Sequence, residues 1–187
     1  MKKKYNTSIV LPLYKKYNEF MYAMNYNYEQ FELMDEIIII IDENADISRL
    51  SYLQNYNINF KLFKNTENHE WRNPAIVINF GIKQVNSKYC IIMSPETILM
   101  RDALKNLILN CDDNSFCLGS VCFLTYDNYE KIDTRQMFLN ETTINELYIG
   151  PLYFGSICCS KQNFEKVNYY NEKFNFSGWG EKMMISE

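Results

Sequence analysis

Short apolar runs alternate with helix-like segments through the first hundred residues of the chain. The second run contains five consecutive isoleucines, whose stiff β-branched side chains favour a strand that is covered on both faces. The third run alternates apolar and polar residues, which indicates a strand nearer an edge of the sheet. Strands and helices in alternation are typical of a mainly parallel sheet with right-handed crossovers. We predict strands at residues 7–13, 35–44, 58–63 and 88–93, and helices at residues 18–33, 46–55 and 73–85, with Asn18 and Asp46 as N-caps.

The pattern changes after residue 100, where the chain becomes richer in strands. Neither an internal repeat nor a linker rich in proline, glycine and serine interrupts the sequence. We therefore predict one α/β domain, 1–187, made of a half at 1–100 and a smaller, β-rich half at 101–187. In the second half we predict helices at residues 102–109 and 160–167, strands at 116–124 and 152–159, a polar segment at 125–150 and a loop at 171–180.

The composition is that of a globular protein with a full core. Of the 187 residues, 47% are hydrophobic and 22% are charged. The net charge of −4 argues against a nucleic-acid partner. No apolar run approaches the roughly 20 residues that span a bilayer, and the apolar run near the N-terminus is shorter than that of a signal peptide. We expect a cytoplasmic protein without a transmembrane segment, and leave open a peripheral attachment to the inner face of the membrane.

The six cysteines do not form a recognisable metal or redox motif. No C-x-x-C pair occurs, and a single histidine, His69, excludes most zinc patterns that combine cysteine with histidine. We predict that the cysteines are reduced and act as small buried apolar residues: Cys90, Cys111, Cys117, Cys122, Cys158 and Cys159.

Acidic side chains follow two of the predicted strands. Glu96 comes after the run at 88–93, and Pro95 should end strand pairing because it has no N–H to donate. Asp42 and Glu43 end the isoleucine strand. Because open α/β sheets bind ligands at the carboxyl ends of their strands, we expect these carboxylates along one functional edge. The alternative is that they are ordinary solvated strand ends.

Motifs of several other enzyme classes are absent from the sequence. It contains no phosphate loop, no G-x-G-x-x-G and no G-x-S-x-G. Instead, five features occur in order: a strand with Pro12, a strand ending in Asp42, Arg72 before a helix, a strand ending near Glu96, and F-S-G-W-G at 176–180. In this order the chain resembles a family 2 glycosyltransferase of the GT-A fold. The F-S-G-W-G segment resembles the acceptor-side motif of galactosyltransferases.

The resemblance covers nearly the whole chain and implies both a fold and an activity. The fold would be an open, mainly parallel, twisted sheet flanked by helices, with nucleotide binding in 1–100 and acceptor binding in 101–187. The activity would be transfer of a sugar from a UDP- or GDP-sugar donor to a hydroxyl of a glycan or lipid-linked acceptor. Inversion at the sugar carbon and a place in surface polysaccharide or glycoconjugate synthesis are implied as well.

The resemblance also implies roles for individual residues. Pro12 and Tyr14 match the segment that borders the nucleobase, and Asp42 matches the residue that contacts base or ribose. Glu181 would be the catalytic base that takes the proton of the acceptor hydroxyl. The donor-binding residues would then be Pro12, Tyr14, Asp42, Arg72, Ser94 and Glu96, and the acceptor-binding residues Trp179 and Gly180.

Two departures from the family pattern affect these roles. Ser94-Pro95-Glu96 stands in place of the Asp-x-Asp that holds a divalent metal. Glu96 would therefore bind Mg²⁺ or Mn²⁺ weakly, or Arg72 would neutralise the diphosphate instead.

The second departure concerns the acidic residues after the tryptophan. Trp179-Gly180 is followed by Glu181, Lys182 and Met183, where the family has x-Glu-Asp. Glu181 reaches the catalytic position only with a shift of one residue, and an acid at the start of a helix is an equal alternative for it. A catalytically degenerate GT-A-like module that binds a nucleotide-sugar or a glycan is therefore the alternative function.

Overall fold

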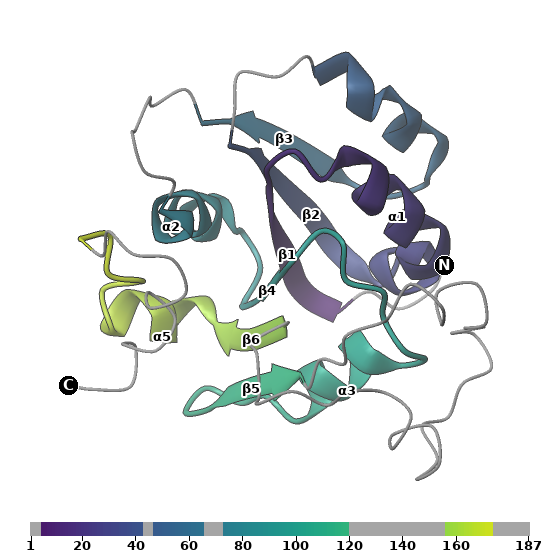
Figure 1. Ribbon diagram of the computed structural model, residues 1–187. Helices are drawn as coiled ribbons and strands as arrows, with labels where there is room; N and C mark the ends of the chain where they lie inside the picture. The colour runs from purple at the N-terminus through teal and green to yellow at the C-terminus, as the bar shows by residue number, and fades with distance from the viewer. Residues whose placement is uncertain (1–4, 43–46, 66–72, 120–155, 174–187) are drawn as a thin grey trace, which may run out of the picture.

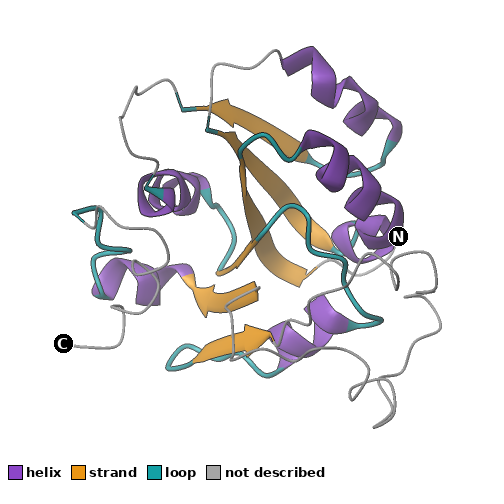
Figure 2. Ribbon diagram, viewed as in Figure 1, coloured by secondary structure: helices purple, strands orange, loops and turns teal. Residues whose placement is uncertain are grey.

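The computed structural model describes residues 5–42, 47–65, 73–119 and 156–173. These residues form one six-stranded sheet with helices on both of its faces (Figures 1 and 2). The strands are β1 (Tyr5–Leu13), β2 (Met34–Ile41), β3 (Phe60–Lys64), β4 (Tyr89–Met93), β5 (Phe116–Gly119) and β6 (Ser156–Ser160). The helices are α1 (Tyr17–Phe31), the 3₁₀ helix η1 (Ile47–Asn55), α2 (Pro74–Gln84), α3 (Ala103–Leu109) and α5 (Lys161–Lys166).

The strand order is β3-β2-β1-β4-β6-β5, and the sheet is mostly parallel. Strands β1, β2, β3 and β4 run in the same direction, whereas β6 is antiparallel to β4 and to β5. The predicted alternation of strands and helices in the first hundred residues is confirmed. The carboxyl ends of β1, β2 and β4 consequently meet at one edge of the sheet, with β1 in the middle.

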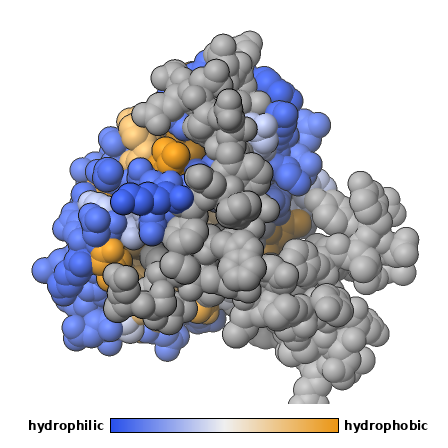
Figure 3. Space-filling model, turned by 60° about the vertical axis from the view of Figure 1, so that its left-hand side comes forward, coloured by the Kyte–Doolittle hydropathy of each residue, from blue (hydrophilic) through white to orange (hydrophobic). Residues whose placement is uncertain are grey.

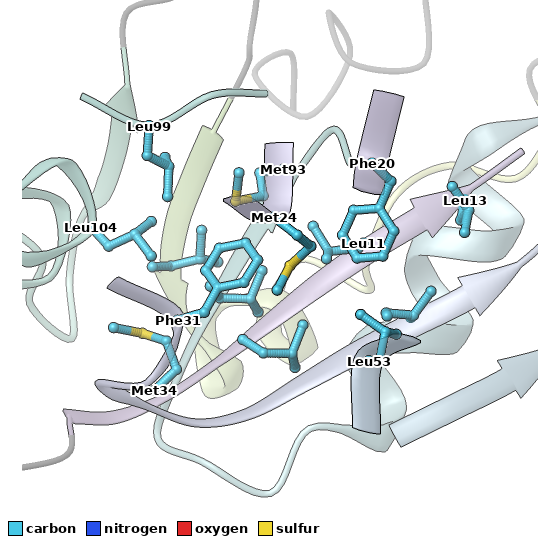
Figure 4. Packing of buried hydrophobic residues seen from close by; sticks show 14 of the residues in the cluster. Leu11, Leu13, Phe20, Met24, Phe31, Met34, Leu53, Met93, Leu99 and Leu104 are labelled. Atoms are coloured by element: carbon cyan, nitrogen blue, oxygen red, sulfur yellow. The ribbon is translucent and has the colours of Figure 1, made fainter. Parts of the chain in front are cut away.

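Two apolar layers cover the two faces of the sheet. Along β2, Ile37, Ile39 and Ile41 belong to the layer beneath α1, η1 and α3 (Figure 4). Ile38 and Ile40 belong to the opposite layer, beneath α2 and α5. All five isoleucines are fully buried, and burying one such side chain contributes about 1.5–3 kcal/mol. The isoleucine run is thus a central strand that is covered on both faces, as its composition predicted.

The backbone of α2 lies directly against the sheet at Gly81. A Cβ atom added there would lie 2.4 Å from Val10 Cγ1 and 3.2 Å from Ile40 Cγ1. Only glycine permits this close approach, so the position of α2 over β1 and β2 depends on Gly81.

Some predicted boundaries differ from the structure. Helix α1 begins at Tyr17 with Lys16 as its N-cap, so the prediction of Asn18 as N-cap was wrong. The reason is Lys15, whose φ of 55° turns the chain sharply after β1 and starts the helix earlier. The short helix after β2 is a 3₁₀ helix, and β3 begins two residues later than predicted, at the edge of the sheet. The predicted cap Asp46, the polar segment 125–150 and most of the loop 171–180 lie outside the described residues.

The cysteines that the structure describes are free thiols within the fold. Cys90, Cys111, Cys158 and Cys159 are buried and Cys117 is partly buried, while Cys122 lies outside the described residues. Burial raises the pKa of Cys159 to about 12, so this thiol stays protonated at neutral pH. These residues behave as the small apolar side chains that the sequence predicted.

One face of the molecule shows how polar and apolar residues are distributed on the described surface. Figure 3 shows one face of the molecule, on which described residues are mostly hydrophilic and apolar residues appear as small separate spots. Scattered apolar residues of this kind are normal on a protein surface. Within the described residues, no helix is long and apolar enough to cross a membrane.

Candidate functional site

A cavity of about 370 Å³ lies at the carboxyl edge of the sheet. Its size is within the range of small-molecule sites, and its position is where open α/β sheets bind ligands. The wall residues come from the end of β1 and the turn after it, the end of β4 and the turn after it, the first turns of α2, the start of β6, and the C-terminal segment after α5. They are Pro12, Tyr14, Lys15, Lys16, Pro74, Ile78, Ile92, Met93, Ser94, Pro95, Glu96, Ile157 and Tyr170.

Four of the six predicted donor-binding residues line this one cavity. Pro12 and Tyr14 come from the end of β1, and Ser94 and Glu96 from the end of β4. The two strands are parallel neighbours, which brings residues 80 positions apart in the sequence to the same edge. Arg72 lies outside the described residues.

A tight turn follows β4 and carries Glu96, the one acidic side chain among the described wall residues. The Thr97 N–H donates to the Ser94 carbonyl at 3.1 Å, so Pro95 and Glu96 occupy the middle of the turn. Proline suits this place because its φ is already that of a turn and its missing N–H is not needed. Ser94 and Glu96 are both exposed and accessible to a ligand.

Two amide side chains of α1 hold the chain that continues from this turn. Asn27 donates to the Thr97 carbonyl at 2.8 Å and accepts from the Leu99 N–H at 2.8 Å. Gln30 donates to the Met100 carbonyl at 2.9 Å and accepts from the Leu104 N–H at 3.1 Å. The two amides thus form hydrogen bonds with backbone N–H and carbonyl groups that have no partner in a neighbouring strand. Without them, these polar groups would be left unpaired. The wall that bears Glu96 is therefore fixed to α1.

Two lysines of the cavity wall were missed by the sequence reasoning. Lys15 and Lys16 follow β1 directly, and both are exposed. Lys15 Nζ lies 4.9 Å from the centre of the Tyr14 ring, and Lys16 Nζ lies 4.0 Å from Glu19 Oε1. The sequence contained the signal for them, because Lys15 and Lys16 follow the carboxyl end of a parallel strand just as Asp42 and Glu96 do.

A second pair of amides fixes the C-terminal segment against α2. Asn79 donates to the Tyr170 carbonyl and to Glu172 Oε1, both at 2.8 Å, and accepts from the Tyr170 N–H at 2.9 Å. Asn73 caps α2 by accepting from the Ala75 N–H at 2.9 Å, and also donates to the Glu172 carbonyl at 2.8 Å. Tyr170, which is buried, is thereby held in the cavity wall. The sequence signal for Asn79 was a polar residue on the apolar side of a helix.

Asp42 lies at the same edge but not in the cavity wall. Its N–H donates to the Leu13 carbonyl at 2.9 Å, which places it beside Tyr14. Its carboxylate accepts a hydrogen bond from Asn65 Nδ2 at 2.9 Å, and the residue is buried. Asp42 and Glu96 therefore share one edge on either side of β1, as predicted, but only Glu96 faces the cavity.

The remaining predicted site residues fall outside the part of the chain that the structure describes. These are Arg72 on the donor side, Trp179 and Gly180 on the acceptor side, and the candidate base Glu181. Glu43 and His69 also lie outside it.

The cavity wall is a poor match to a divalent metal ion. Mg²⁺ and Mn²⁺ prefer carboxylate and other oxygen ligands, and the described wall residues supply one carboxylate and three hydroxyls beside two ammonium groups. Among the described residues, no cluster of three or more histidine, cysteine, aspartate or glutamate side chains could hold a metal. The described donor set therefore forms no metal centre by itself, without ligands from a substrate.

Comparison with known proteins finds the fold but no family. No protein-family model and no curated protein matches the chain. Among solved structures, the mannosyltransferase PcManGT from Pyrobaculum calidifontis, in complex with GDP-Man and Mn²⁺, matches with a TM-score of 0.60 and 12% identity, over 92% of this chain and 49% of that one. A crystal structure of S. aureus TarS 1–349 matches with a TM-score of 0.55 and 14% identity, over 91% of this chain and 52% of that one.

A third structure is a 4-diphosphocytidyl-2C-methyl-D-erythritol synthase from Anaerococcus prevotii, with a TM-score of 0.51 and 13% identity, over 96% of this chain and 82% of that one. The chain spans about half the length of the first two proteins. At these identities the likeness concerns the fold alone. The chain therefore has a GT-A-like α/β fold, with a mixed, mostly parallel sheet flanked by helices.

Proposed function

We propose that this protein is a glycosyltransferase that transfers a sugar from a nucleoside-diphosphate donor to an acceptor hydroxyl, with inversion. The observation that carries the proposal is the gathering of Pro12, Tyr14, Ser94 and Glu96 around one cavity. The sequence resemblance assigns all four to donor binding. The GT-A-like fold supports the proposal, and one structural neighbour was solved with a GDP-sugar.

In this proposal the nucleoside lies over the end of β1. Pro12 and Tyr14 border the base, and Asp42, which is buried beside Tyr14 at the end of β2, supports this wall without lining the cavity. The diphosphate then extends toward Ser94 and Glu96 at the end of β4, with Arg72 as a further cation. No step is assigned to a metal ion, because the described cavity wall forms no metal centre by itself.

We propose that the C-terminal F-S-G-W-G motif at 176–180 binds the acceptor. Asn73 and Asn79 hold the chain at Glu172 beside the start of α2, and Glu181 follows nine residues later in the sequence. Nine residues can extend over at most about 30 Å, which limits how far from Glu172 the proposed base can lie. Trp179 would offer an apolar platform to the acceptor sugar. Glu181 would take the proton as the acceptor oxygen bonds to the anomeric carbon and the bond to the leaving diphosphate breaks.

The acceptor, the donor base and the cellular setting follow from the resemblance alone. We propose a UDP- or GDP-sugar donor, a glycan or lipid-linked acceptor, and a place in surface polysaccharide or glycoconjugate synthesis in the cytoplasm. Because the chain spans about half the length of its glycosyltransferase neighbours, these remain proposals for the whole protein.

The test is calorimetric titration with UDP and GDP, followed by measurement of donor hydrolysis and sugar transfer. Glu96→Gln should lower transfer, and Glu181→Gln should abolish transfer while leaving nucleotide affinity unchanged. Glu165→Gln, an exposed acid on α5 that is not in the cavity wall, is the matched control. Full transfer activity in the Glu181 variant would remove its catalytic role.

A binding module without catalysis is the second candidate function. Lys182 and Met183 stand where the family pattern has acids, and this favours it. Nucleotide binding without hydrolysis or transfer in the full-length protein would select this alternative. Absence of nucleotide binding would contradict both functions.

A further inference from the structure

The described charged residues of the cavity wall carry a net positive charge, in a protein whose net charge is negative. Among the described wall residues there are two lysines and one glutamate, and the others are neutral. The whole chain has a formal net charge of −4. Concentrated positive charge in a cleft of an acidic protein selects for anionic ligands, because the rest of the surface repels them.

Both lysines are exposed at the cavity wall. Lys16 and Glu19 are 4.0 Å apart, and their side chains are 50% and 48% exposed, so their mutual attraction is weak in water. The Lys15 ammonium lies over the Tyr14 ring, which is itself part of the wall, so its charge is held at the cavity. A phosphate group of higher charge would compete readily with Glu19 for Lys16.

The N-termini of α1 and α2 both lie near the cavity, but they differ in side-chain capping. The difference favours anion binding at α1, beside the two lysines. At α2, the Asn73 side chain already accepts from the Ala75 N–H, and Pro74 has no N–H. At α1, the N-cap is Lys16, which makes no side-chain capping hydrogen bond. The positive end of the α1 dipole therefore adds to the field of the two ammonium groups.

We infer that Lys15 and Lys16 bind the diphosphate of the donor and that this binding needs no divalent metal. The inference rests on the proposed function, and it adds the two residues that neutralise the negative charge of the diphosphate. It also accounts for the wall's shortage of acidic ligands, since two ammonium groups beside Glu96 replace the charge that a metal would bring. Each lysine acts as a point charge with three donors, suited to a flexible diphosphate.

The experiment titrates the full-length protein with inorganic pyrophosphate, UDP and GDP, once in EDTA and once with Mn²⁺. We expect binding in EDTA with an affinity within about threefold of that in Mn²⁺, and weaker binding at high salt. Lys15→Gln and Lys16→Gln should each weaken the affinity for pyrophosphate and for the nucleotide by about tenfold or more. Lys105→Gln, an exposed lysine of α3 outside the wall, removes the same charge and should leave both affinities unchanged. Circular dichroism verifies that the variants are folded.

The outcomes separate this inference from the proposed function. Nucleotide binding that requires Mn²⁺, or that the lysine variants do not change, would overturn the inference and leave a nucleotide site in place. Lysine-dependent binding of pyrophosphate in EDTA, with UDP and GDP no tighter than pyrophosphate, would support the lysines' role and contradict the nucleotide function. No binding of any of the three probes overturns both.

Discussion

Replacing Asn79 should destabilise the protein and loosen one wall of the cavity. Asn79 is 2% exposed and forms three hydrogen bonds with the segment that contains Tyr170 and Glu172. Asn79→Ala would deprive the buried N–H and carbonyl of Tyr170 of these partners. At about 1–3 kcal/mol for each buried group left unpaired, partly offset by water entering the gap, we expect a loss of about 2–4 kcal/mol.

Thermal unfolding followed by circular dichroism measures this loss. For a chain of this size, a loss of about 2–4 kcal/mol lowers Tm by roughly 4–16 °C. Nucleotide affinity should fall as well, because Tyr170 lines the cavity. The matched control is Asn110→Ala, since this exposed asparagine donates to the Asn106 carbonyl at 2.8 Å and its loss should change stability by less than about 0.5 kcal/mol.

A near-isosteric variant tests the polarity of the contact separately from its shape. Asn79→Asp places a carboxylate against the Tyr170 carbonyl and the Glu172 carboxylate, and burial together with this repulsion raises the pKa of the introduced group. Because its folded pKa lies above its unfolded pKa, the variant should gain stability relative to Asn79→Ala as pH falls. If Asn79→Ala and Asn79→Asp both match the wild type within about 0.5 kcal/mol at neutral pH, the amide does not hold this segment.

Two further predictions concern stability. Gly81→Ala should cost about 1–3 kcal/mol in chemical denaturation, because the new Cβ would meet Val10 Cγ1, and a net gain from helix propensity would show that α2 does not pack this closely. At the other end of the strands, burial opposes ionisation of Glu36, but hydrogen bonds from Lys61, the Asn86 N–H and Ser8 together leave the pKa of this carboxyl below its ordinary value of 4.5. Its stabilising effect is therefore complete above pH 4.5 and is lost as the pH falls through the lowered folded value, so Glu36→Gln should flatten the acid limb of a plot of unfolding free energy against pH, and an unchanged limb would contradict this assignment.

The sequence by itself determined the order of the elements and the edge of the sheet where the cavity lies. Five adjacent isoleucines can bury all of their side chains only in a strand that is covered on both faces, and β2 is such a strand. Pro95 ends β4 because it cannot donate to a ladder, which puts Glu96 at the carboxyl edge. These conclusions follow from local backbone chemistry and from hydrophobic periodicity, both of which can be seen along a single segment.

Only the tertiary structure decided which residues of that edge share a cavity. Asp42 and Glu96 follow equivalent strands, yet Asp42 is buried with Asn65 as a partner while Glu96 faces the cavity. Asn79 forms hydrogen bonds with the backbone of Tyr170 because two segments 91 residues apart in the sequence pack together. The direction of β6 and the orientation of side chains at the edge depend on contacts between distant segments, and no local pattern encodes those contacts.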